Sequence, residues 1–180
     1  MNANMTIAVL TAVEAERHMP RLVEILTASV GDGALVGFVL PFSADQARAY
    51  WHGTIRSVSL GERLLVCALI EGQVVGTVQL YLSPEPNAPH RAEVYKLLVH
   101  RDFQRRGLGA ALMDRVELEA GHRNRSLLIL DTVQAGAGER LYRRRGWQEI
   151  GIVPNHFVDP FGNAKASVYF MKHLVAPAAS

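Results

Sequence analysis

The chain has 180 residues, close to the ~150 of a typical domain, which predicts one domain with a single hydrophobic core. Hydrophobic residues make up 49% and charged residues 20%, a globular balance that excludes wholesale disorder. The formal net charge is only +2, and even the stretch 101–145, with ten arginines against six carboxylates, is too weakly basic for binding along a nucleic acid.

The N-terminal third of the chain has helical periodicity. Residues 13–30 carry an apolar stripe at helical spacing that stops before Gly31. A second helix is expected over about 44–59, because Ser43 and Gln46 form a capping-box pattern at its start.

Strands dominate the rest of the chain, where the period changes. The first two apolar, β-branched runs are joined by Glu71-Gly72, which predicts a hairpin. The expected elements, in chain order, are strands at 64–70, 73–82 and 92–99, a helix at 107–122, a strand at 127–131, a helix at 138–145, and strands at 147–153 and 166–174, followed by a frayed tail at 175–180.

This order predicts a mixed α/β (α+β) fold. Strand–helix–strand units favour parallel pairing, whereas the two hairpins impose antiparallel pairing. We therefore expect a mixed sheet with helices on both faces.

The chain carries no pattern that predicts export or membrane insertion. Uncharged runs stay near a dozen residues, as in 33–44, whereas a membrane span needs ~20. The N-terminus lacks the basic and apolar regions of a signal peptide. The single cysteine, Cys67, excludes an internal disulfide and a Cys-rich metal site, and favours a reducing compartment. We expect a cytoplasmic protein that binds neither metal nor membrane.

The segment with the clearest chemistry is 104–110, between a strand and an amphipathic helix. The first backbone N–H groups of a helix lack partners within it and point outward with the positive end of the dipole. Gly107 and Gly109 have no Cβ, so an anion can approach the main chain closely, and Arg105 and Arg106 add charge beside it. These features indicate a pyrophosphate cradle.

Two familiar phosphate loops fit this segment poorly. A P-loop ends in Gly-Lys-Ser/Thr, and the segment has no lysine. A dinucleotide fingerprint needs a third glycine where Leu112 stands.

A pair of motifs gives the segment a family resemblance. The pattern Gln104-x-x-Gly107-x-Gly109 after a strand, followed later by Leu141-Tyr142-x-x-x-Gly146-Trp147, resembles the GCN5-related N-acetyltransferases (GNAT). The resemblance covers about 62–174, which it identifies as an acetyl-CoA-binding core in a mostly antiparallel sheet. Residues 1–60 correspond to the variable helical region on the acceptor side of that family.

The resemblance implies acetyl-CoA as cosubstrate, a small-molecule amine as acceptor, and no metal. The residues that it assigns to cofactor binding are Leu97, Leu98, Val99, Gln104, Arg105, Arg106, Gly107, Leu108, Gly109 and Ala110. A homodimer is common in the family, and the oligomeric state stays open.

Three residues are candidates for catalysis. The stretches 91–97 and 130–132 resemble more particularly the tabtoxin-resistance branch of the family, in which the residues matching Glu93 and Asp131 deprotonate the acceptor. Tyr142 matches the family's proton donor to the CoA thiolate. The alternatives are a solvent-facing Glu93, an Asp131 that caps a turn, and a Tyr142 that only packs.

The sequence says less about which residues form the acceptor pocket. Tyr50, Trp51, Tyr95 and His156 are aromatic candidates for it that the sequence does not place. Many family members also have Asn and Ala where this chain has Ala135 and Gly138, which removes an expected contact to the pantetheine arm.

The leading functional hypothesis is thus an acetyl-CoA-dependent N-acetyltransferase that acts on the amine of a small molecule. If the chain is a resistance protein, that molecule is an amino-acid-like toxin or antibiotic. A longer acyl-CoA donor is a competing hypothesis. The non-enzymatic alternative is a CoA-binding or regulatory module that keeps the fold without activity.

Overall fold

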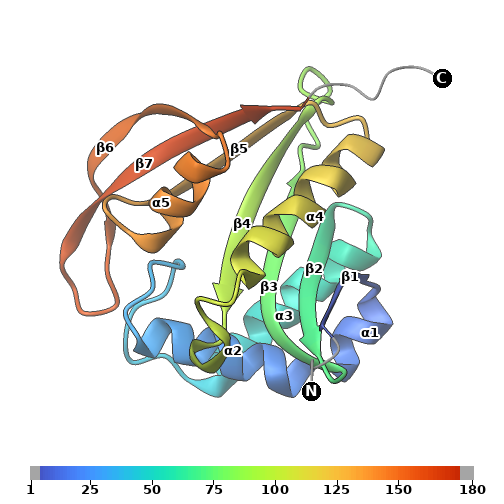
Figure 1. Ribbon diagram of the computed structural model, residues 1–180. Coiled ribbons are helices and arrows are strands. Elements are labelled where there is room, and N and C mark those ends of the chain that lie inside the picture. The colour runs from blue at the N-terminus through green and yellow to red at the C-terminus, as the bar shows by residue number, and fades with distance from the viewer. Residues whose placement is uncertain (1–4, 175–180) are drawn as a thin grey trace.

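A computed structural model describes residues 5–174. One seven-stranded sheet has the order β1-β2-β3-β4-β5-β7-β6, and every neighbouring pair is antiparallel except β4 and β5 (Figure 1). The strands are β1 (Met5–Leu10), β2 (Arg63–Ile70), β3 (Gln73–Leu82), β4 (Arg91–Val99), β5 (Leu127–Val133), β6 (Gln148–Val158) and β7 (Ala164–His173). The helices are α1 (Ala12–Arg17), α2 (Met19–Gly31), α3 (Ala44–Ser59), α4 (Leu108–His122) and α5 (Ala137–Arg144), with a 3₁₀ turn η1 (Arg101–Phe103).

The mixed α/β fold with a mostly antiparallel sheet is confirmed. The predicted hairpin forms β2 and β3, and α3 begins with the predicted capping box, in which the Ser43 hydroxyl accepts from the Gln46 N–H at 3.2 Å. The predicted tail at 175–180 lies outside the described residues.

The N-terminal region differs from the sequence prediction. The single helix expected over 13–30 is two helices that meet at His18, because Pro20 is the second residue of α2 and has no N–H to continue the helix before it. The strand β1 was not predicted at all. Its six residues form the edge of the sheet and pair only with β2, a long-range contact that local periodicity does not encode.

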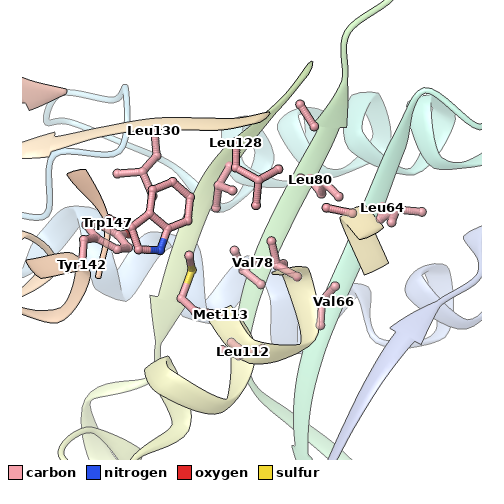
Figure 2. Close-up of a cluster of buried hydrophobic side chains, with 14 of the residues drawn as sticks. Leu64, Val66, Val78, Leu80, Leu112, Met113, Leu128, Leu130, Tyr142 and Trp147 are labelled. Atoms are coloured by element: carbon pink, nitrogen blue, oxygen red, sulfur yellow. The ribbon is translucent and has the colours of Figure 1, made fainter. Parts of the chain in front are cut away.

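Two hydrophobic clusters hold the layers together. On one face, α4 packs on the sheet through Leu112 and Met113, which share a cluster with Val78 (Figure 2). On the other face, α2 and α3 meet at Trp51, which has no exposed surface and whose indole N–H donates to the Leu22 carbonyl at 2.9 Å. Trp51 is therefore a core residue, and its candidacy for the acceptor pocket was wrong.

The strands β4 and β5 stay together only briefly. They pair in parallel from Arg91 to Glu93, and then they diverge (Figure 1). The other edge of β4 contains a bulge, because one residue of β3 lies opposite two of β4 between the pairs Thr77–Leu98 and Gln79–Tyr95. Lys96 lies in this bulge with a φ of 52°. The bulge bends β4 away from β5 and opens the sheet.

We predict opposite effects for two glycine-to-alanine substitutions. A Cβ at Gly76 of β3 would lie 3.0 Å from the Leu98 carbonyl oxygen and 3.2 Å from Leu112 Cδ1, so Gly76→Ala should lower the free energy of unfolding by about 1–3 kcal/mol through overpacking. Gly53 of α3 faces open space, so Gly53→Ala should raise it by about 0.5–1 kcal/mol. Urea unfolding of both variants measures the difference. Equal stability of the two would contradict the close approach of α4 to β3.

Candidate active site

The divergence of β4 and β5 leaves a cavity of about 280 Å³ between them. Its wall comes from five separate segments of the chain. These are residues 35–37, 94–97 of β4, 131–133 of β5, Tyr142 of α5, and 157–158 of β6. The loop that carries residues 35–37 is fastened to the β6–β7 turn, where the Leu40 N–H donates to the Pro160 carbonyl at 3.0 Å.

Asp131 is the residue that links the predicted catalytic groups. It lines the main cavity together with Tyr142, and it lines a second cavity of about 130 Å³ together with Glu93. Glu93 pairs in register with Ile129, so Asp131 lies two residues further along β5 on the same face of the sheet. The Ser167 hydroxyl donates to the Asp131 carboxylate at 2.7 Å.

Glu93 is half-buried and already has partners. Its carboxylate accepts a hydrogen bond from the Tyr95 hydroxyl, and an Arg91 guanidinium nitrogen lies 4.0 Å away. Burial and this contact with Glu93 raise the pKa of the Tyr95 phenol above its usual value. Tyr95 therefore stays protonated as a donor to Glu93.

Tyr142 is buried in the core at the side of the main cavity. Its ring packs against those of Trp147 and Phe170, with centroids 5.9 and 6.0 Å away, and Figure 2 shows it beside Trp147. Burial, and then the negative charge of Asp131, raise the pKa of the phenol. The phenol of Tyr142 is thus neutral at physiological pH.

The sequence analysis missed Lys96 as a site residue, although it lines the main cavity. Burial, and then the positive charge of Arg63, lower the pKa of its ammonium, and Asp131 opposes them. The available signal was a lysine within the otherwise apolar run 94–99. Residues 35–37 and 157–158 reach the cavity only through tertiary contacts and gave no such signal.

The predicted pyrophosphate cradle lies at the start of α4. Gly107 is the N-cap with a φ of 81°, and it offers no side chain to the first N–H groups of the helix. A Cβ there would meet open space, so the approach to these donors is clear. Arg105 and Arg106 are exposed and take part in no ion pair within residues 5–174. The geometry suits a multiply charged anion.

Two glycines near the site differ in the space around them. A Cβ at Gly109 would lie 3.4 Å from Leu141 Cδ2, which is an ordinary van der Waals contact. The departure at Gly138 has a steric cause, because a Cβ there would lie 2.7 Å from the Thr132 hydroxyl oxygen. The alanine of the family pattern would collide with β5 in this chain.

Residues 5–174 lack two further features, a metal-binding cluster and a membrane-spanning helix. No group of three His, Cys, Asp or Glu side chains is placed to hold a metal ion. None of the helices there combines the length and the apolar character that crossing a bilayer requires.

Comparison with known proteins identifies the family. The sequence model of the acetyltransferase (GNAT) family matches residues 39–147, more than half of the chain. The chain belongs to this family. The resemblance read from the two motifs is confirmed at this level.

Solved structures share the fold at low sequence identity. An N-acetyltransferase from Staphylococcus aureus Mu50 is 15% identical with a TM-score of 0.79, over 96% of this chain and 100% of that one. The yncA protein of Salmonella typhimurium, solved with its cofactor acetyl-CoA, is 20% identical with a TM-score of 0.77, over 99% and 98%. A ribosomal-protein-alanine N-acetyltransferase from Brucella melitensis is 22% identical with a TM-score of 0.75, over 94% and 99%.

If the cradle binds the pyrophosphate of CoA, CoA should stabilise this GNAT protein by about 2.7 kcal/mol at a concentration 100 times its Kd. Gly107→Val should abolish the rise in melting temperature, because its side chain would stand over the helix N-terminus. Gly61→Val is the matched control, since Gly61 has a similar φ of 74° with open space around it but lies outside the cradle. Thermal melts with and without CoA test this. If the wild-type melting temperature is the same with and without CoA, the assignment of residues 104–110 as a pyrophosphate site is wrong.

Proposed function

We propose that the protein transfers an acetyl group from acetyl-CoA directly to the amine of a small molecule. The observation that carries this function is the position of Asp131 between the two cavities, with a second carboxylate, Glu93, on one side and a buried phenol, Tyr142, on the other. A carboxylate can accept a proton from the acceptor amine and a neutral phenol can donate one to the leaving thiolate, which are two of the proton transfers that the reaction needs.

The chain offers two surfaces for acetyl-CoA. Gln104 to Ala110 would hold the pyrophosphate on the α4 N-terminus, where Gln104 is fixed by its side-chain donation to the Val99 carbonyl at 3.0 Å. Beyond Glu93, the edge of β4 that faces β5 has no partner strand within residues 5–174, which leaves Leu97 to Val99 beside the opening. The bound cosubstrate supplies an acetyl group activated as a thioester.

The acceptor amine must lose a proton before it can react. An alkyl amine has a pKa of ~10.4 and is almost wholly protonated at pH 7. Glu93 or Asp131 accepts that proton. The amine nitrogen then forms a bond to the acetyl carbon and loses its second proton to solvent, the carbon–sulfur bond breaks, and the sulfur takes the phenolic proton of Tyr142. Solvent returns a proton to Tyr142 and removes one from the carboxylate.

An amino-acid-like amine is the acceptor class that we favour, following the resemblance of residues 91–97 and 130–132 to the tabtoxin-resistance branch. A small cavity of about 280 Å³ also suits a small acceptor. The alternative, an inactive CoA-binding module, gives no reason for a proton donor and two carboxylates to line adjoining cavities.

Three broader proposals complete this function. We place the protein in the cytoplasm, because its one cysteine is free and buried in β2. We regard residues 1–60 as the acceptor-side part of a single N-acetyltransferase domain that spans the chain. A homodimer fits the exposed Ile150 and Ile152 of the edge strand β6.

Tyr142→Phe should lower kcat by about 10²–10⁴-fold if protonation of sulfur limits turnover, because the variant lacks the phenolic donor. The CoA-induced rise in melting temperature should stay as in the wild type, since the ring remains in the core. Steady-state release of CoA thiol measures turnover. An unchanged kcat would assign the proton to water and leave Tyr142 a packing role.

Glu93→Gln and Asp131→Asn should each lower turnover, and the double variant should lose less than the product of the two single effects, because both carboxylates serve one amine. The acidic limb of the pH–rate profile should shift or vanish in at least one single variant. Glu85→Gln, in an exposed loop, is the control and should leave the profile unchanged. Strictly multiplicative losses with an unchanged limb would show that the two acids act separately and that neither is the base.

A further inference from the structure

The main cavity carries opposite charges that do not neutralise each other. Lys96 and Asp131 both line it, yet they form no ion pair within residues 5–174. The other two lysines of the chain have carboxylate partners: Lys165 lies 3.5 Å from Asp159, and Lys172 lies 2.8 Å from Glu117. Lys96 is thus the lysine whose ammonium is taken out of water without a counter-ion.

The surroundings of Lys96 hold its cation without cancelling the charge. The bulge directs the side chain to the α3 face of the sheet, where Nζ lies 5.8 Å from the centroid of the Phe38 ring and 5.6 Å from that of Tyr50. Aromatic faces attract a cation but leave its hydrogen-bond donors free. A Cβ at Gly37 would lie 3.5 Å from Nζ, so the loop covers the ammonium closely.

A second cation stands on the same face. Arg63 of β2 stacks over Tyr95, with Cζ 5.6 Å from the ring centroid, and its Nη1 donates to the Gln79 side chain. Its Nε is buried and has no hydrogen-bond partner among the described residues. After burial, the positive charge of Arg63 lowers the pKa of Lys96, as expected of a neighbouring cation, while the negative charge of Asp131 raises it.

We propose that Lys96 binds an anionic group of the acceptor, either a carboxylate or a phosphonate. This group lies next to the acceptor amine, whose proton goes to Glu93 or Asp131. This inference rests on the proposed function and narrows its acceptor to zwitterions. Such a molecule would place its amine near Asp131 and its anionic group near Lys96, so that each side chain would gain a partner of opposite charge. Neutral amides and simple amines would leave the ammonium of Lys96 unpaired, which is the basis of discrimination.

The test compares acceptors that differ only in the anion. A panel of α-amino acids, their carboxamides and the corresponding aminophosphonates is offered with acetyl-CoA to the wild type, Lys96→Met and Lys96→Arg. Lys165→Met is the matched control, because Lys165 does not line the cavity and its ammonium faces the Asp159 carboxylate instead. Release of CoA thiol gives kcat and KM for each acceptor, and equilibrium binding of the same acceptors in the presence of CoA gives a readout that does not need turnover.

The wild type should favour the anionic acceptors over the amides by about 10–100-fold in kcat/KM. Lys96→Met should raise KM for anionic acceptors by about the same factor, change kcat by no more than about threefold, and leave amides as they were. Lys96→Arg should keep the preference, as should Lys165→Met. The relative rates of carboxylates and phosphonates identify the anion.

Two kinetic results and one binding result would overturn the proposal. Transfer to amides as fast as to amino acids would remove the selectivity for anions while leaving the proposed acetyl transfer intact. A loss of kcat in Lys96→Met for every acceptor, with unchanged KM, would assign Lys96 to the chemical step instead. If no acceptor is acetylated, the proposed function fails, and binding decides the role of Lys96: anion-dependent binding lost in Lys96→Met supports it, and its absence refutes it.

Discussion

The parting of β4 and β5 after three residue pairs is the constraint on which the site depends. One extra residue in β4 turns that strand away from its neighbour, and every group of the candidate active site lies at or just beyond the point of divergence. Without the bulge, continued pairing would close the cavity and cover the free edge of β4. Asp131 would then be an ordinary sheet residue, because it is only two positions past the last pair.

Burial at this opening acts on two titratable groups in the direction of neutrality. It raises the pKa of Tyr142 and lowers that of Lys96, because a low-dielectric environment disfavours a phenolate and an ammonium alike. Asp131 raises both pKa values, since its negative charge stabilises the protonated form of each. One carboxylate thus favours a neutral phenol on one side and a cationic lysine on the other.

The sequence predicts what is local and misses what depends on register. The capping box of α3, the hairpin and the glycines before α4 are written in adjacent residues, and the structure contains all three. Asp131 and Tyr142 were each predicted from a family resemblance, but the cavity that they share depends on a strand divergence that no single segment encodes. Trp51 and Lys96 are the instructive errors. Trp51 was a candidate for the acceptor pocket, yet it is fully buried in the core. Lys96 was not a candidate site residue, yet it lines the main cavity.

One part of the main cavity wall is built from two segments that are far apart in the sequence. Residues 35–37 come before the sheet core and residues 157–158 after it, and the contact of Leu40 with Pro160 ties the two segments together. A side chain at Gly33 would lie 3.1 Å from the Phe161 ring, and one at Gly37 would lie against Lys96. Both glycines have positive φ values of 87° and 85°, so other residues would be strained there whatever the space. The shape of this loop and the position of Lys96 are therefore coupled.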